Sequence, residues 1–256
     1  MAAKRQRSRV VRTGLRLALL LGCTLAGSGC VSTSESSTPT IALFTSLPIV
    51  WPERQDFRGL IASDAPPHWA LAALRRYGPV QPLDTLVRAN ARPAMASGSL
   101  LVMAQPRPLS PQENVALDNW VRGGGHVLLF ADPMLTAESL FALGDKRRPQ
   151  DVLMLSPILT RWGLELRFDE DQPAGERAMD WNGAKLPVNL PGHFALLGES
   201  RMCRLLAEGF AARCTIGKGQ VLALADAALL EYGAADAVSG RATILDQLLI
   251  ESGSQN

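Results

Sequence analysis

The sequence has few of the residues on which hydrolytic and metal chemistry most often depends. Its 256 residues include four cysteines and three histidines. Two of the cysteines, Cys203 and Cys214, lie in the body of the chain with no histidine or further cysteine nearby. Their spacing therefore resembles no metal site, and we expect neither a metal ion nor a bound cofactor.

Acidic residues are absent from residues 1–30, which hold six of the 26 basic residues. The remainder of the chain has 20 basic and 24 acidic residues, so its net charge is −4. This acidic body argues against nucleic acid as a partner, because nucleic-acid binding requires a basic surface. With 47% hydrophobic and 20% charged residues, the chain can bury an ordinary core, which excludes wholesale disorder.

The first 30 residues have the layout of a secretory signal. Basic residues up to Arg16 precede a short apolar run at residues 17–26, and small residues follow. The run is about half the roughly 20 residues that a membrane-spanning helix needs. We expect residues 1–30 to be a signal peptide, residues 31–40 to form a flexible tether, and the protein to be exported to the periplasmic side of a bacterial membrane.

The end of this signal resembles a bacterial lipobox at residues 26–30, in which Cys30 receives the lipid and becomes the mature N-terminus. Gly27 stands where such motifs usually have leucine, and Cys23 is a rival with a shorter apolar region before it. The alternative is ordinary cleavage near Gly29, which would release a soluble periplasmic protein.

An exported protein enters an oxidising compartment, where Cys203 and Cys214 are expected to form a disulfide bond. Residues 202–206 and 211–216 have the pattern of two facing strands, which would bring the cysteines together. A disulfide closing this loop would contribute about 3 kcal/mol in the chain-entropy model. Two buried, reduced thiols are the alternative.

A strand–helix–strand unit is the clearest local pattern. The apolar run at residues 100–104 is followed by Ser110, Pro111 and Glu113, the N-cap, first position and third position of a helix with a capping box. Gly123 ends this helix, and the apolar run at residues 126–131 follows. A helix between two strands at this spacing predicts a parallel sheet.

The rest of the chain continues this alternation and predicts one α/β domain at residues 41–252. Its expected architecture is three-layered, with helices on both faces of a mostly parallel sheet and with a C-terminal hairpin and helix. We expect an irregular excursion at residues 169–191, interrupted by an Asn182-Gly183 hairpin signal. Further strands are expected at residues 41–45, 80–83, 164–168 and 221–225, and further helices at residues 66–77, 156–162 and 241–250.

Residues 45–51, 109–135 and 156–166 together resemble an uncharacterised family of exported domains. That family is related to the gliding-motility and ABC-type-transport auxiliary proteins. The resemblance implies a class I glutamine-amidotransferase-like or flavodoxin-like fold and a transporter context. It implies no established reaction.

Catalysis by such a fold would need a cysteine on a sharp turn after a central strand, activated by a histidine. Here the strand at residues 126–131 continues into Asp132, Pro133 and Met134, without a nucleophile or the flanking glycines of an elbow. The sequence therefore argues against an enzyme. The alternative is a hydrolase or amidotransferase-like enzyme with an unorthodox site near Asp132.

A ligand site is expected where parallel strands end, because open α/β sheets bind ligands outside the carboxyl ends of their strands. Four residues occupy such ends: Thr45, Ser46, Gln105 and Asp132. We therefore predict a cleft that these four side chains line. In the competing interpretation, Asp132 caps the turn that follows it, as Asp side chains often do two residues on.

Other motifs favour structural roles over functional ones. The glycines at residues 123–125 follow a helix and enter a strand, which is the reverse of a phosphate-binding loop. Residues 217–219 lack the spacing of such a loop. The acidic run at residues 169–171 and the basic run at residues 146–148 are typical of solvated loops, although the first has carboxylates that a divalent cation could bind.

These observations favour a non-catalytic accessory or binding domain in the cell envelope. Its partner would be an envelope or transporter protein, and an N-terminal lipid would join it to the membrane. A periplasmic solute-binding protein is a further alternative, although such proteins normally have two lobes around a deep cleft.

Overall fold

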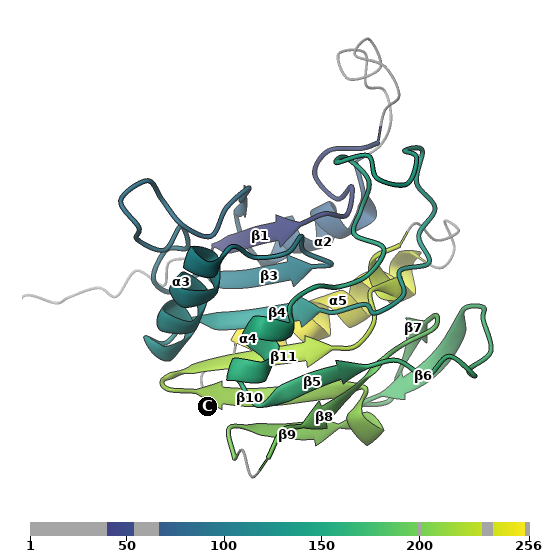
Figure 1. The fold of residues 1–256 in the computed structure, drawn as a ribbon. Coiled ribbons are helices and arrows are strands. Elements are labelled where there is room, and N and C mark those ends of the chain that lie inside the picture. The colour runs from purple at the N-terminus through teal and green to yellow at the C-terminus, as the bar shows by residue number, and fades with distance from the viewer. Residues whose placement is uncertain (1–39, 54–66, 199–200, 232–237, 254–256) are drawn as a thin grey trace, which may run out of the picture. The chain divides into compact units, whose positions relative to one another are not determined.

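The computed structural model describes residues 40–53, 67–198, 201–231 and 238–253 (Figure 1). The expected signal peptide, Cys23, Cys30 and nearly all of the tether lie outside these residues. Within them, no helix has the length and apolar character that crossing a bilayer requires.

A seven-stranded sheet occupies the centre, in the order β2-β1-β3-β4-β11-β10-β9. The strands β2, β1, β3, β4 and β11 are all parallel, whereas β10 runs antiparallel to both of its neighbours. The sheet is therefore mixed but mostly parallel, as predicted. The strands are β1 (Ile41–Thr45), β2 (Val80–Pro82), β3 (Leu100–Ala104), β4 (His126–Phe130), β9 (Cys203–Leu206), β10 (Ala211–Ile216) and β11 (Gly219–Leu224).

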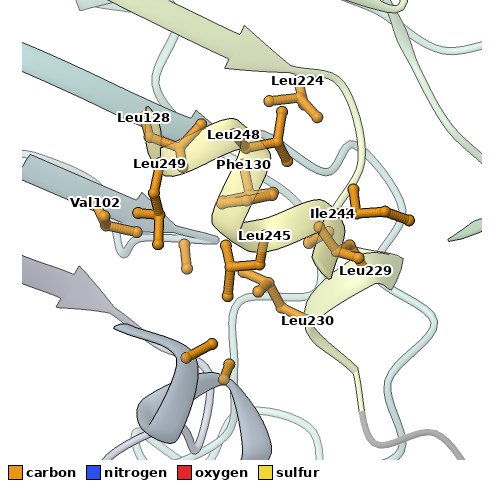
Figure 2. Packing of buried hydrophobic residues seen from close by; sticks show 14 of the residues in the cluster. Val102, Leu128, Phe130, Leu224, Leu229, Leu230, Ile244, Leu245, Leu248 and Leu249 are labelled. Carbon is orange, nitrogen blue, oxygen red and sulfur yellow. The ribbon is translucent and has the colours of Figure 1, made fainter. Parts of the chain in front are cut away.

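Helices cover both faces of this sheet, as Figure 1 shows. The helices α2 (Trp69–Tyr77) and α5 (Val238–Gly253) pack on one face, and α3 (Pro111–Arg122) and α4 (Ser156–Arg161) on the other. Successive side chains of a strand point to opposite faces, so each apolar run contributes side chains to a core on both faces of the sheet. Figure 2 shows the first of the two resulting cores, in which leucines of α5 meet Leu128 and Phe130 of β4.

The predicted strand–helix–strand unit is confirmed in detail. The Ser110 side chain caps α3, and the Glu113 side chain completes the capping box. At the other end, Gly123 is the C-cap. A Cβ on Gly125 would lie 2.3 Å from the Trp120 ring, so only glycine permits this close return into β4. The glycine run is thus a helix stop.

Three local predictions differ from the structure. Helix α2 begins at Trp69, with His68 as its N-cap, rather than at residue 66. The strand β5 (Leu164–Arg167) does not join the central sheet but pairs with β8 (His193–Leu196) in a separate two-stranded sheet. The stretch at residues 169–191 is more regular than expected, because the predicted Asn182-Gly183 hairpin signal extends into the two strands of β6–β7 described next.

That hairpin consists of β6 (Arg177–Trp181) and β7 (Ala184–Val188), with Asn182-Gly183 at its turn. Trp181, Leu186 and Val188 are buried in the same core as α2 and α5. The hairpin therefore packs against this core through β7 and the last residue of β6. Two short 3₁₀ helices complete the described elements, η1 (Ala207–Gly209) and η2 (Ala228–Leu230).

Cys203 and Cys214 lie opposite each other in the antiparallel ladder between β9 and β10. Their sulfur atoms are 1.98 Å apart, the separation of a disulfide bond. Both residues are buried. The bond fastens the outermost strand of the central sheet to its neighbour.

Candidate functional site

The four residues predicted to line a ligand cleft do meet at the carboxyl ends of β1, β3 and β4. The Thr45 hydroxyl donates to the Ala104 carbonyl (2.7 Å) and accepts from the Leu47 N–H (2.9 Å). The Ser46 hydroxyl donates to the Gln105 carbonyl and accepts from the Gln150 N–H. Both hydroxyls thus hold neighbouring strand ends and loops together.

Gln105 and Asp132 differ from the prediction, because both are 0% exposed and neither lines the cavity described below. The Gln105 amide donates to the carbonyls of Asp132 (3.0 Å) and Gln150 (2.8 Å), and its oxygen accepts from the Asp132 N–H (2.9 Å). Gln105 also has a positive φ of 42°, which these bonds help to hold. Its side chain is occupied by the protein itself.

The Asp132 carboxylate supports backbone in two places. One oxygen accepts from the Met134 N–H two residues on (2.8 Å), as the turn-capping interpretation predicts. The other accepts from the Ala227 N–H (3.0 Å), just beyond β11. Burial is the main cause that raises the pKa of Asp132 to about 6.

A second buried carboxylate, Asp226, lies at the end of the neighbouring strand and was not predicted as a site residue. It accepts hydrogen bonds from the N–H groups of Ala228 and Asn189. Burial, and then repulsion from Asp132, raises the pKa of Asp226 to about 8. The signal in the sequence was a repeated pattern, since both parallel strands, β4 and β11, run to an alanine and then an aspartate.

A cavity of about 580 Å³ opens beside the buried strand ends. We call it the strand-end cavity, and its lining includes Thr45, Ser46, Trp51, Asp84, Arg107 and Lys146. Trp51 has 73% of its surface exposed. The cavity combines an aromatic ring with basic and acidic groups, which suits a partner side chain or a small polar ligand.

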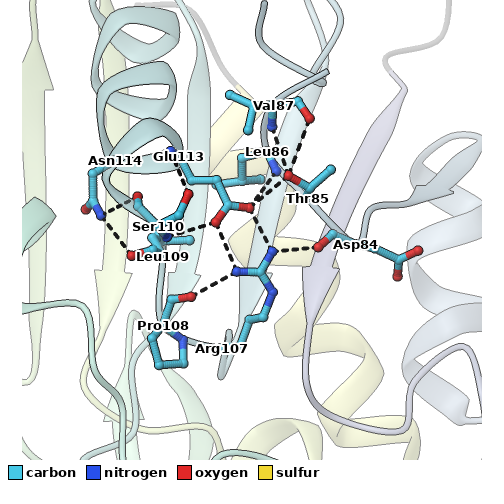
Figure 3. A network of polar contacts seen from close by, with 10 residues as sticks. All are labelled: Asp84, Thr85, Leu86, Val87, Arg107, Pro108, Leu109, Ser110, Glu113 and Asn114. Atoms are coloured by element: carbon cyan, nitrogen blue, oxygen red, sulfur yellow. Dashed lines mark hydrogen bonds and ion pairs between the residues drawn. The ribbon is translucent and has the colours of Figure 1, made fainter. Parts of the chain in front are cut away.

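A buried network fixes Arg107 at the edge of this cavity (Figure 3). Its guanidinium binds both carboxylate oxygens of Glu113, at 3.0 and 2.7 Å. The same carboxylate accepts from Thr85 and from the Leu86 N–H, so it joins α3 to the connection after β2. Burial opposes ionisation, but the hydrogen bonds from Arg107, Ser110, Leu86 and Thr85 outweigh it and lower the pKa of Glu113.

The basic run at residues 146–148 lines the cavity as well, although two of its three charges are already paired. Arg147 binds Asp145 and Arg148 binds Asp151. Among the described residues, Lys146 has no ion pair. The run is thus mainly an internally paired loop, with Lys146 as an exposed cation in the lining of the cavity.

The histidines do not converge on the strand ends. His68 caps α2 through its Nδ1, which accepts from the Ala70 N–H (3.1 Å), and burial lowers the pKa of His68 to about 4. The Nδ1 of His126 lies 2.9 Å from the Ser252 carbonyl oxygen, and His193 begins β8. In the described ranges, no cluster of histidine, cysteine or carboxylate side chains could hold a metal ion, the acidic run at residues 169–171 included.

Comparison with solved structures gives distant similarities. An exo-β-1,4-mannosidase from Opitutaceae bacterium strain TAV5 is 12% identical with a TM-score of 0.47, over 84% of this chain and 35% of the enzyme. The mmIFT52 N-terminal domain is 12% identical with a TM-score of 0.48, over 73% of this chain and 90% of that domain. The cytoplasmic protein STM1381 from Salmonella typhimurium LT2 is 11% identical with a TM-score of 0.48, over 83% and 99%.

No curated protein matches the chain. A family of proteins described as an ABC-type uncharacterized transport system does match, over residues 38–177. That match covers more than half of the 256 residues and includes β1 to β5, the strand-end residues and the Glu113 network. The chain therefore belongs to the auxiliary family of ABC-type transport systems.

Proposed function

We propose that this chain is a non-catalytic accessory component of an ABC-type transport system, and that it binds a partner or ligand at the strand-end cavity. One observation carries the proposal. Where an amidotransferase keeps its nucleophile, this chain has Asp132, whose two oxygens both support backbone N–H groups and which is closed to solvent. The side chains that a partner or ligand could contact lie beside it, in the lining of the strand-end cavity, and include Trp51, Arg107 and Lys146.

The alternative of a hydrolase or amidotransferase-like enzyme near Asp132 has weaker support. An acid or base must reach the proton that it transfers, and Asp132 is buried beneath its own turn. Cys203 and Cys214 are bonded to each other and lie at the opposite side of the sheet order from β1. Neither cysteine therefore supplies a free thiol nucleophile at the strand ends.

For the finer fold class, we propose a relationship to the class I glutamine-amidotransferase-like or flavodoxin-like folds. The parallel strands β2, β1, β3, β4 and β11 with helices on both faces support it. We also keep the proposal that residues 41–252 are a single domain. Placing the binding site at the carboxyl ends of the strands follows the general behaviour of open α/β sheets.

We further propose that the protein is exported and held on the periplasmic side of the membrane by a lipid on Cys30. The disulfide between Cys203 and Cys214 supports an oxidising compartment. Labelling with a fatty-acid analogue is expected to depend on Cys30 and to survive Cys23→Ala. Labelling that survives Cys30→Ala would contradict the anchor and favour ordinary cleavage of the signal.

The accessory function is tested by photo-crosslinking in the cell. A benzoylphenylalanine placed at Trp51 is expected to crosslink the full chain to a subunit of an ABC transporter, identified by mass spectrometry. The control is the same residue at Val115, which is 61% exposed but lies on α3. Equal crosslinking at both positions, or none to a transporter subunit at position 51, would contradict the proposal.

A soluble ligand is the second candidate, because the cavity has the size of small-molecule sites. A ligand that binds only the folded state raises the midpoint of thermal unfolding. Lys146→Ala and Trp51→Ala should remove such a shift, whereas Val115→Ala should leave it unchanged. A shift that survives both cavity variants would place the ligand elsewhere.

A further inference from the structure

The outer edge of β5 has no neighbouring strand in the ranges that the structure describes, since β5 pairs only with β8. The Leu197 N–H donates to the Gly163 carbonyl (2.9 Å), just before the first pair of this antiparallel ladder. Gly163 and Leu197 are therefore a hydrogen-bonded pair. Such pairs alternate with non-hydrogen-bonded pairs. The N–H and C=O groups of Leu164 and Leu166 therefore point away from β8. Leu164 is 0% exposed, so only the partly exposed Leu166 presents these groups at the open edge.

A cavity of about 580 Å³, lined mostly by apolar residues, lies along this edge. We call it the β5 groove. Its walls come from the loop before α4, from α4 and from β5 itself, and they include Val152, Leu159, Thr160, Leu164, Leu166 and Phe168. The groove shares no lining residue with the strand-end cavity, so it is a separate surface.

Three acidic residues, at residues 169–171, follow β5 after Phe168, and all three are exposed. The Asp169 carboxylate accepts the Asp171 N–H. In the part of the chain that the structure describes, none of these carboxylates takes part in an ion pair. One end of the β5 groove therefore has acidic side chains that form no ion pair with the described residues.

We propose that the β5 edge binds an extended segment of a partner protein by strand addition, with apolar side chains at alternate positions and basic residues at one end. The N–H and C=O groups of Leu166 supply the hydrogen bonds, and the groove receives the apolar side chains. The acidic run selects the basic end.

This surface extends the proposed accessory function by a second point of contact and does not depend on the first. A failure at Trp51 would remove the strand-end site and leave the β5 groove untouched. A failure at β5 would leave the crosslinks from position 51 as they are. The two proposals are therefore distinguishable.

The probe is the fluorescent peptide Lys-Lys-Val-Thr-Val-Thr-Val, and binding to the full chain is measured by anisotropy. Leu166→Pro removes one N–H from the open edge without removing a bond to β8, a position in which strands tolerate proline. Leu166→Ala, the control, loses the same side chain and keeps that N–H. We expect the proline variant to bind about tenfold or more weakly than the alanine variant; equal affinities would overturn strand addition.

If Leu166→Pro does not fold, two modified peptides decide the question. One carries N-methyl groups on its valines and the other on its threonines, so each loses the donors of a single edge. Strand addition requires that only one of them loses about tenfold or more in affinity. Equal binding by both would overturn the proposal.

The chemistry of the partner has its own test. Replacing both lysines of the peptide by serine should weaken binding several-fold, and the joint change of Asp169→Asn, Glu170→Gln and Asp171→Asn should remove that difference. A peptide without lysines that binds equally well would contradict the basic end. A dimer in sedimentation that Leu166→Pro dissociates would overturn the choice of partner, because a second copy would then occupy the edge.

Discussion

Two regions of the molecule bury carboxylates to the same extent, yet these carboxylates shift in opposite directions. Glu113 and Asp118 lie on α3 and are each 2% exposed, whereas Asp132 and Asp226 lie at the ends of β4 and β11 and are 0% and 2% exposed. The pKa is lowered for the first two and raised for the second two. Burial alone therefore does not decide which buried acid is charged.

The difference lies in the donors. Glu113 binds the guanidinium of Arg107, and Asp118 binds those of Arg122 and Arg161. Among the described residues, Asp132 and Asp226 accept hydrogen bonds from backbone N–H groups only, and the two carboxylates repel each other. A cation compensates the loss of hydration in the first region, and nothing of equal charge does so in the second. Ion pairs thus keep the carboxylates of α3 charged, whereas the raised pKa values of Asp132 and Asp226 make stability at the strand ends depend on pH.

The largest expected effect comes from breaking the helix side. Glu113→Gln leaves an amide facing Arg107 and removes an acceptor from a buried network, so we expect a loss of about 3 kcal/mol in the free energy of unfolding. The control is Glu165→Gln, which breaks an ion pair that is about half exposed and should change stability by less than about 0.5 kcal/mol. Urea denaturation measures both. Equal losses would mean that the network contributes no more than a surface pair.

The second effect is a pH dependence at the strand ends. The pKa of Asp226 is raised to about 8 in the folded chain, so its contribution to stability is fully present below its unfolded pKa and is lost as pH rises toward 8. Between pH 6.5 and pH 8 we expect the free energy of unfolding to fall by about 2 kcal/mol. In Asp226→Asn, which does not titrate, this fall should disappear.

That pH window separates Asp226 from His68. The pKa of His68 is lowered to about 4, so its contribution is present above its unfolded pKa of about 6.5 and is lost only as pH falls toward 4. Asp226→Asn loses one of two acceptors at every pH, so the slope is the measurement rather than the stability at one pH. A variant with the slope of the parent protein would show that Asp226 is charged when folded.

The sequence predicts the helix side of this comparison better than the strand ends. The capping box at Ser110 and Glu113 is a local pattern, and it forms as predicted. Asp226 accepts from Asn189, 37 residues away, which no local pattern contains. The same limit applies to β5, whose apolar alternation fits any sheet; only the tertiary structure decides that it pairs with β8. Periodicity identifies elements, whereas partners distant in sequence decide where they pair.

The smallest expected effect concerns the coupling between the two strand-end carboxylates. Repulsion from Asp132 is the second cause, after burial, that raises the pKa of Asp226. Asp132→Asn removes this repulsion and should move the fall in stability to lower pH by about one unit or less, because burial still acts on Asp226. Repeating the denaturation series between pH 5 and pH 8 gives the midpoint. An unchanged midpoint would show that the two carboxylates titrate independently, and burial would then be the whole difference from the helix side.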